Sequence, residues 1–167
     1  MKRGFTMVEL VLVIAMIGIQ ALVLGPPIMN AVKEYSLVWS RRQTLAEARS
    51  AMDRMVKEIR LIPSAAAIVN ISGPAQFTFQ YPLGTTITYG LSGTDLQRNG
   101  ILLAPNVGLL EFKYYNSAGT ETSTASNVRT IQIRLTMNAP SAQGTLPLTT
   151  TVFLRNMGNN YGNFTSP

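Results

Sequence analysis

The apolar residues of this chain are concentrated near its amino-terminal end. Residues 5–29 contain one charged side chain, Glu9, and between Leu10 and Leu24 only Gln20 is strongly polar. About 20 consecutive apolar residues are enough for a helix to cross a bilayer. The pattern therefore predicts a membrane-spanning helix over residues 5–29. Glu9 is its exceptional position, because a carboxylate within lipid is unfavourable.

From Ile28 onward the pattern becomes amphipathic. Apolar residues recur at steps of three and four, the spacing of one helix face; they are Leu45, Ala48, Met52, Met55, Val56, Ile59 and Ile62. Arg54 and Glu58 have the spacing of a helical ion pair, and Pro63 is expected to end the helix. We therefore expect one long helix from Phe5 to about Ile62, with residues 30–63 as its amphipathic part.

Residues 64–156 show the alternation of strands separated by turns. The expected strands are Gln76–Tyr81, Thr85–Leu91, a strand from Leu96 that runs into a tight hairpin turn at Asn99-Gly100, Val107–Tyr115, Val128–Met137 and Leu148–Asn156. In Val107–Tyr115 and Val128–Met137 apolar residues alternate with others, and we expect the apolar ones to point inward. They are Leu110, Phe112, Tyr114, Ile131, Ile133, Leu135 and Met137. A helix followed by about six or seven strands predicts an α+β fold, with the long amino-terminal helix packed on an antiparallel β-sheet head. Residues 157–167 are expected to be a flexible tail.

The charges and residue types limit the chemistry of the head. The net charge is +6, but no block of like charge stands out. The chain has no cysteine and no histidine, which removes thiol and imidazole catalysis and the usual zinc ligands. The acidic residues after position 60, Asp95, Glu111 and Glu121, are far apart in the sequence, so neither a glycosidase pair nor a calcium loop is indicated. We expect no enzyme activity, no metal and no cofactor.

Three interpretations of the amino-terminal segment compete. A cleaved secretory signal needs a small-x-small site after the apolar run, but a Gly-Pro-Pro sequence stands there instead. A plain membrane anchor fits the length, and Lys2 and Arg3 predict a cytoplasmic start and an outward head. That interpretation leaves Glu9 unexplained, and the third interpretation rests on the residues around Glu9.

The sequence Lys2-Arg3-Gly4 followed by Phe5-Thr-Met-Val-Glu9 resembles the class III signal of type IV pilin-like proteins. The resemblance implies that a prepilin peptidase removes residues 1–4 as a leader, cutting between Gly4 and Phe5, and that Phe5 becomes an N-methylated amino terminus. Gly4 has no side chain, so a protease can approach its backbone closely.

The same resemblance gives Glu9 a role in assembly. It implies that Glu9 pairs with the terminal amino group of a neighbouring subunit and sets the axial register, an attraction that a low dielectric strengthens. A second interpretation stays open, because a carboxylate near its own helix amino terminus is favoured by the helix dipole. Gly25, Pro26 and Pro27 also fit the family pattern and predict a kink or helix break, since proline lacks the amide hydrogen and clashes with the preceding turn.

The head carries a weaker resemblance. The segments ITYGL, DLQRNG, VGLLEFKYY, VRTIQIRL and TTVFLRN, in this order, are similar to minor pseudopilin J of type II secretion and to W-type minor pilins. The resemblance implies a structural subunit that primes the tip of a pseudopilus or pilus, anchored in the bacterial inner membrane with its head in the periplasm or outside. The implied partners are other minor and major pilin-like subunits, the prepilin peptidase and the inner-membrane assembly platform. Glu9 disfavours the K type of pseudopilin, and the lack of a disulfide argues against a major pilin.

DNA binding, as in a competence pilin, is the alternative function. The basic residues of the head are candidates for one DNA-binding face, and two tyrosines are candidates for stacking on bases; these residues are Arg98, Lys113, Arg129, Arg134, Arg155, Tyr114 and Tyr115. A solvated sheet face explains the same residues, so we expect nucleic-acid binding to be absent. The domain plan expected from sequence is a leader (1–4), a membrane or filament-core helix (5–29), an amphipathic helix (30–63), a β head (64–156) and a tail (157–167).

Overall fold

The computed structural model of this chain describes residues 6–81, 84–139 and 144–155. Its first element is α1 (Met7–Arg60), one continuous helix of 54 residues. The chain divides into two compact units, Met1–Arg41 and Arg42–Pro167. α1 therefore contributes its first part to one unit and its last part to the other. The expectation of a single long helix is confirmed, with an end at Arg60 close to the predicted Ile62.

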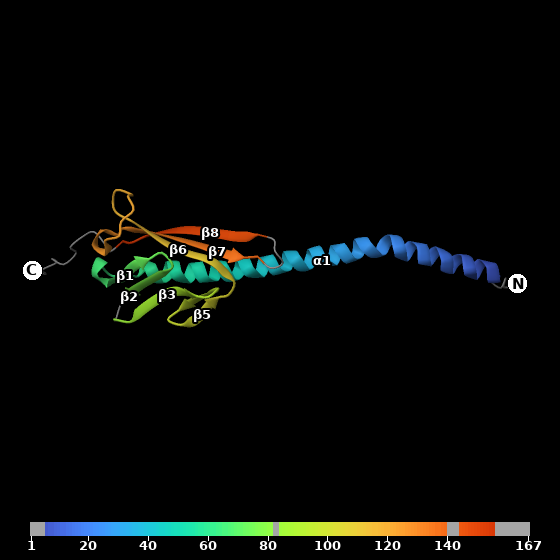
Figure 1. Cartoon of the computed structure of the whole chain (residues 1–167), viewed down its shortest axis with the longest axis horizontal. Coiled ribbons are helices and arrows are strands. Elements are labelled where there is room, and N and C mark those ends of the chain that lie inside the picture. Colours follow the sequence, from blue (N-terminus) through green and yellow to red (C-terminus); the bar gives the residue numbers. More distant parts are fainter. Residues whose placement is uncertain (1–5, 82–83, 140–143, 156–167) are drawn as a thin grey trace, which may run out of the picture. The chain divides into compact units, whose positions relative to one another are not determined.

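The rest of the second unit consists of strands and two short 3-10 helices (Figure 1). In chain order the elements are η1 (Ala65–Ala67), β1 (Ile68–Gly73), β2 (Gln76–Gln80), β3 (Thr86–Ser92), β4 (Asp95–Arg98), β5 (Ile101–Ala104), β6 (Val107–Tyr115), η2 (Ala125–Asn127), β7 (Thr130–Asn138) and β8 (Thr145–Phe153). The molecule is thus α+β, as its sequence predicts.

The strands form two antiparallel sheets where the sequence predicted one. The first sheet has five strands in the order β1-β2-β3-β4-β5, and the second has three in the order β6-β7-β8. β6 meets the turns of the first sheet through two backbone hydrogen bonds of 2.7 Å, from Phe112 N–H to the Pro74 carbonyl and from Val107 N–H to the Thr94 carbonyl. β1 and β5 were not expected, because β5 is only four residues long and two register shifts interrupt the pairing of β1 with β2.

The Asn99-Gly100 turn was predicted correctly. It joins β4 to β5, and Asn99 and Gly100 have φ values of 52° and 78°. Two successive residues with positive φ produce the tight turn whose twist matches the flanking strands, and asparagine and glycine adopt that conformation most readily.

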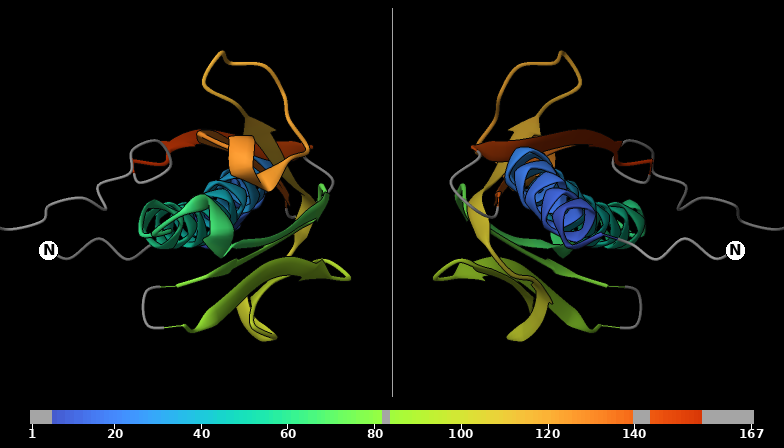
Figure 2. Two further views of the ribbon diagram at one scale, coloured as in Figure 1. Left: turned by 90° about the vertical axis from the view of Figure 1, so that its left-hand side faces the viewer. Right: turned by 90° about the vertical axis from the view of Figure 1, so that its right-hand side faces the viewer.

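One apolar core joins the last part of α1 to both sheets. Figure 2 shows the green part of the helix between the orange and red strands of the second sheet and the green to yellow strands of the first. The buried residues of the helix are Ala48, Ala51, Met52, Met55 and Ile59, on the amphipathic face that the sequence predicts. All seven strand residues expected to point inward are buried.

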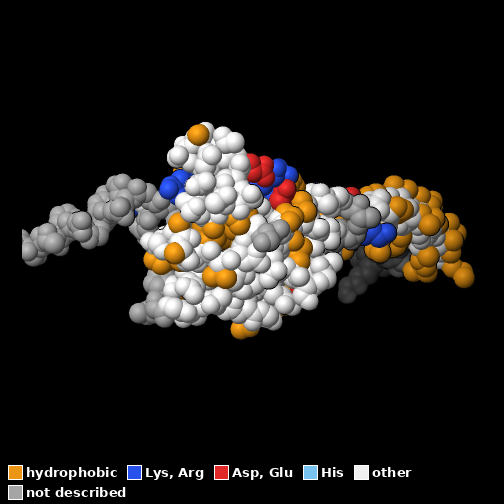
Figure 3. Space-filling model, turned by 60° about the vertical axis from the view of Figure 1, so that its left-hand side comes forward, with side chains coloured by type: hydrophobic (Ala, Val, Ile, Leu, Met, Phe, Trp, Pro, Cys, Tyr) orange, Lys and Arg blue, Asp and Glu red, His pale blue; other side chains and the backbone are white. Residues whose placement is uncertain are grey.

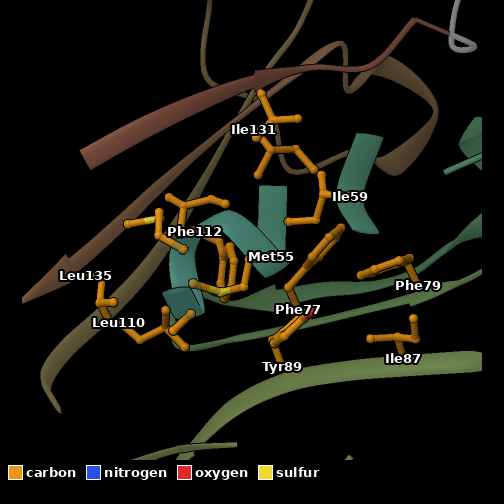
Figure 4. Close-up of a cluster of buried hydrophobic side chains, with 14 of the residues drawn as sticks. Met55, Ile59, Phe77, Phe79, Ile87, Tyr89, Leu110, Phe112, Ile131 and Leu135 are labelled. Atoms are coloured by element: carbon orange, nitrogen blue, oxygen red, sulfur yellow. The ribbon is translucent and has the colours of Figure 1, made fainter. Parts of the chain in front are cut away.

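Aromatic rings form the centre of this core. The ring of Phe77 on β2 lies 5.5 Å from that of Phe112 and 5.6 Å from that of Tyr114, both on β6. Figure 4 shows Met55 of α1 within the same cluster of side chains. The two sheets are therefore held together by side-chain packing across β2 and β6, with the helix closing the cluster.

Candidate functional site

The first part of α1 is apolar, and its large side chains are exposed. By length and composition α1 contains a segment apolar enough to cross a membrane, and none of its 18-residue apolar window is buried. Figure 3 shows the orange side chains of this part of the helix. A contiguous apolar surface of this size marks an interaction with a membrane or another protein.

Glu9 lies in the first turn of this helix. Its N–H donates to the carbonyl of Thr6 at 3.1 Å and to the Thr6 hydroxyl at 3.3 Å. Thr6 therefore acts as the amino-terminal cap, and the Thr-x-x-Glu spacing is that of a capping box. This position places the exposed carboxylate of Glu9 near the positive end of the helix dipole. The intramolecular interpretation of Glu9 thus has a geometric basis, while the pairing with a neighbouring subunit stays a prediction.

Gly4 and Phe5, the predicted cleavage and methylation residues, lie outside the described residues. Gly25, Pro26 and Pro27 lie inside them, and the predicted helix break is absent, because α1 continues through all three. The alternative of a kink stays a prediction. Two prolines remove two amide donors from the helix, but the intact turns on either side support the same conformation. A loss of helix in this stretch on assembly stays a prediction.

The most polar cluster of the head links α1 to the first sheet. Glu58 accepts a hydrogen bond of 2.6 Å from the Tyr89 hydroxyl on β3. The Arg98 Nε on β4 donates to the same carboxylate at 2.9 and 3.1 Å, and Arg54 Nε donates at 3.3 Å. The sequence predicted the pair of Arg54 and Glu58, which the structure confirms, but it missed Tyr89 and Arg98.

Burial and hydrogen bonding act in opposite directions on Glu58. Burial by itself raises the pKa of this carboxyl, but hydrogen bonds from Arg98, Tyr89 and Arg54 outweigh that effect, so the pKa is lowered. Burial, together with the hydrogen bond to Glu58, raises the pKa of Tyr89. Glu58 is therefore ionised and Tyr89 is neutral near neutral pH, the protonation states in which the hydroxyl donates to the carboxylate.

Tyr114 on β6 differs from Tyr89 in the surroundings of its hydroxyl group. Its side chain is buried, and its hydroxyl oxygen has no hydrogen-bond partner among the described residues. Burial raises the pKa of Tyr114, so the hydroxyl is neutral. An unpaired buried hydroxyl costs about 1–3 kcal/mol. Tyr114 therefore contributes its ring to the core while its oxygen opposes folding.

Four of the five basic residues proposed for a DNA-binding face are engaged within the head, whereas the fifth, Arg155, is exposed. Arg98 pairs with Glu58 at 2.9 Å, Arg134 with Glu111 at 3.0 Å and Lys113 with Glu121 at 3.9 Å. A guanidinium nitrogen of Arg129 donates to the carbonyls of Ser126 and Val128, both at 2.9 Å. On the face seen in Figure 3 acidic and basic side chains lie next to one another. These basic side chains therefore do not form a patch of purely positive charge.

The proposed stacking residues also differ from expectation. Tyr114 is only 5% exposed, so its interpretation as a stacking platform is wrong, because β6 turns its side chain into the core. Tyr115 points to the opposite face, and its hydroxyl lies 3.4 Å from the Gln132 side-chain oxygen. The alternation of β6 predicted this difference between the two tyrosines.

The surface depressions of the head differ in their lining, and two of them carry charged side chains, Asp53 and Lys57 in one and Glu121 in the other. Another depression, of about 460 Å³, is lined by Gly73, Pro74, Ala75, Gln76, Thr88, Gly90, Leu91, Gln97 and Gly100. None of these side chains is ionisable, and the Thr88 hydroxyl lies 3.1 Å from that of Thr78. Within residues 6–81, 84–139 and 144–155 no three acidic side chains are grouped to hold a metal ion.

No protein-family model matches this sequence, and neither does any curated protein. Function is therefore inferred from two features of the molecule. One is the exposed apolar part of α1, and the other is the head that is built around the last part of the same helix.

Proposed function

We propose that this protein is a membrane-anchored structural subunit of the type IV pilin-like class. Within that class we favour a minor pseudopilin or minor pilin, which primes assembly at the tip of a type II secretion pseudopilus or a type IV pilus. The contrast within α1 carries the proposal. Large apolar side chains between Met7 and Leu24 are exposed, whereas Ala48, Met55 and Ile59 of the same helix are buried in the head.

This contrast fits a subunit that assembles through its helix. The exposed apolar part needs a lipid or protein environment, since water is unfavourable for so much apolar surface. The buried part keeps the head folded on the helix when that environment changes from membrane to filament. The polar cluster at Glu58 supports the same role, because its hydrogen bonds hold the helix to the sheet.

In the proposed pathway the helix inserts in the inner membrane with Lys2 and Arg3 on the cytoplasmic side. The prepilin peptidase removes residues 1–4, and Phe5 becomes the methylated amino terminus. The assembly platform then brings the subunit together with other pilin-like subunits. Glu9 pairs with a neighbour's amino group, and the loss of lipid contacts is offset by helix-to-helix packing.

Processing by a prepilin peptidase tests the family assignment directly. Co-expression of the full chain with an active peptidase should give a product whose intact mass lacks residues 1–4 and carries one added methyl group. Gly4→Val should block the cut, because a branched side chain hinders the approach of the protease to the backbone. Gly18→Val is the matched control, since no atom lies within 4 Å of a Cβ built there.

The control should be cleaved like the natural sequence. A full chain that keeps residues 1–4 beside a peptidase that processes its usual substrate would show that the prepilin interpretation is wrong. The membrane anchor itself is tested separately, by flotation of the uncleaved chain with vesicles.

A further inference from the structure

We propose that Tyr35 and Trp39 form an aromatic anchor in the headgroup layer of the bilayer, on the side from which α1 continues into the head. This inference rests on the membrane anchor of the proposed function and deepens it by fixing the depth of the helix. It also moves the boundary between membrane and water from residue 29 to residues 33–39.

Tyr35 and Trp39 lie on one exposed face of α1. The side chain of Tyr35 is 73% exposed and that of Trp39 is 60% exposed. They are four positions apart in the sequence, so the two rings are neighbours on the helix surface. Ile28 and Val32, both 60% exposed, continue the same face toward the amino terminus. These four residues, the interfacial stripe, form an uncovered apolar surface within the unit Met1–Arg41.

The opposite side of this helical segment carries polar and charged residues together with one apolar residue, Leu37. At 100° per residue Asn30, Lys33 and Glu34 lie on the far side from the interfacial stripe. An amphipathic segment of this kind, with aromatic rings on one face and charges on the other, is suited to the boundary between lipid and water. A segment inside the hydrocarbon would be apolar on all sides.

The length of the uncharged stretch agrees with this placement. No charged residue occurs from Leu10 to Val32, a helical length of about 35 Å at 1.5 Å per residue. The hydrocarbon layer is about 30 Å thick, and a helix tilt of about 20° brings the two lengths closer. The hydrocarbon therefore ends near Val32, and Tyr35 lies about 4–5 Å beyond it, within a headgroup layer of about 5–7 Å.

The backbone of Trp39 lies about 10 Å beyond Val32 along the helix axis, roughly 3 Å outside that layer. Helical side chains lean toward the amino terminus of their helix, so the indole reaches back toward the bilayer. Tryptophan and tyrosine combine an apolar ring with one polar group, which is why both are enriched at membrane interfaces. Lys33 can extend its ammonium group to the same polar layer.

Trp39 is the only tryptophan of the chain, so its fluorescence reports on this position alone. The full chain is reconstituted in vesicles of phosphatidylethanolamine and phosphatidylglycerol that carry a nitroxide quencher on either the headgroup or the middle of the acyl chain. We expect the headgroup label to quench Trp39 more strongly, with emission at shorter wavelength than in the urea-unfolded chain. Stronger quenching by the mid-chain label, or by aqueous iodide alone, would overturn the proposal.

A second variant separates this proposal from the membrane anchor itself. Trp39→Phe combined with Ile17→Trp moves the single tryptophan to the middle of the apolar run, where the mid-chain label should quench it best. If this probe is quenched and Trp39 responds to no lipid label, the anchor is correct and the aromatic inference is wrong. If neither probe responds, the membrane anchor fails as well. Trp39 quenching that disappears as subunits crowd in the membrane would assign the rings to a neighbouring subunit and overturn the proposal.

Discussion

The Tyr89 hydroxyl on β3 donates a hydrogen bond of 2.6 Å to the Glu58 carboxylate on α1. Tyr89 itself is fully buried, and the Glu58 side chain is 14% exposed. Arg98 on β4 completes the arrangement from the neighbouring strand of the same sheet. The Glu58 carboxylate therefore links α1 to two neighbouring strands of the first sheet, in addition to the apolar core that holds the same part of the helix.

The two buried tyrosines should respond differently to loss of the hydroxyl. Tyr89→Phe removes a hydrogen bond to a charged group and should lower the free energy of unfolding by about 1.5–3 kcal/mol. Tyr114→Phe removes an unpaired hydroxyl and should leave that free energy unchanged or raise it by about 1 kcal/mol. Urea unfolding of a fragment covering residues 30–167 measures both. Equal destabilisation by the two substitutions would contradict the hydrogen-bond assignment.

Glu58 should make the head sensitive to acid. Its pKa is lower in the folded protein than the usual 4.5, so its stabilising effect is fully present above the unfolded pKa and is lost as the pH falls through the folded value. The stability difference between the natural sequence and Glu58→Gln should be largest near neutral pH and shrink below about pH 4.5.

The matched control for this acid effect is Glu121→Gln. The Glu121 side chain is 62% exposed and its ion pair with Lys113 is 3.9 Å long, so we expect a change of less than about 1 kcal/mol at any pH. Urea titrations at several pH values give both differences. A Glu58→Gln deficit that persists unchanged in acid would rule out the proposed linkage.

Two isoleucines provide a test of the core. Ile59 on α1 is fully buried, whereas Ile101 on β5 is 70% exposed. Ile59→Ala should destabilise the head by about 2–5 kcal/mol through lost burial and the cavity left behind. Ile101→Ala should change stability by about 0.5 kcal/mol or less. If the two variants unfold at the same urea concentration, α1 is not a core element of the head.

Glu9 should matter for assembly and not for processing. Glu9→Ala should be cleaved normally but incorporated about tenfold less, since each 1.4 kcal/mol of lost pairing reduces an equilibrium tenfold. Gln20→Ala, at the other strongly polar position of the apolar run, is the control. Quantifying the subunit in sheared filaments measures incorporation. Normal incorporation of Glu9→Ala would leave only the helix-dipole interpretation of this carboxylate.

Nucleic-acid binding is expected to be absent. Arg98, Lys113 and Arg134 have carboxylate partners, so DNA phosphates would have to displace those carboxylates. In a gel shift the fragment 30–167 should show no salt-sensitive DNA binding at micromolar protein. Binding that weakens steeply with added salt would support the competence alternative instead.

The sequence predicted those features that depend on neighbouring residues. The three- and four-residue spacing of Ala48, Met52, Met55 and Ile59 identified the buried face of α1, because that face repeats with the helix turn. The alternation along β6 and β7 identified their inward residues, and Asn99-Gly100 identified a hairpin. All of these signals lie within a few residues of the structure that they predict.

Tertiary structure decided which elements those faces meet. Periodicity predicted that Tyr114 is buried, but it does not show that the Tyr114 hydroxyl has no partner or that the Tyr89 hydroxyl lies beside Glu58. Glu58 is 31 positions from Tyr89 and 40 from Arg98, so their contact depends on strand register and on where the helix crosses the sheet. The separation into two sheets has the same cause. Hydrogen bonds between strands are set by three-dimensional pairing, and a single strand's sequence does not encode its partner.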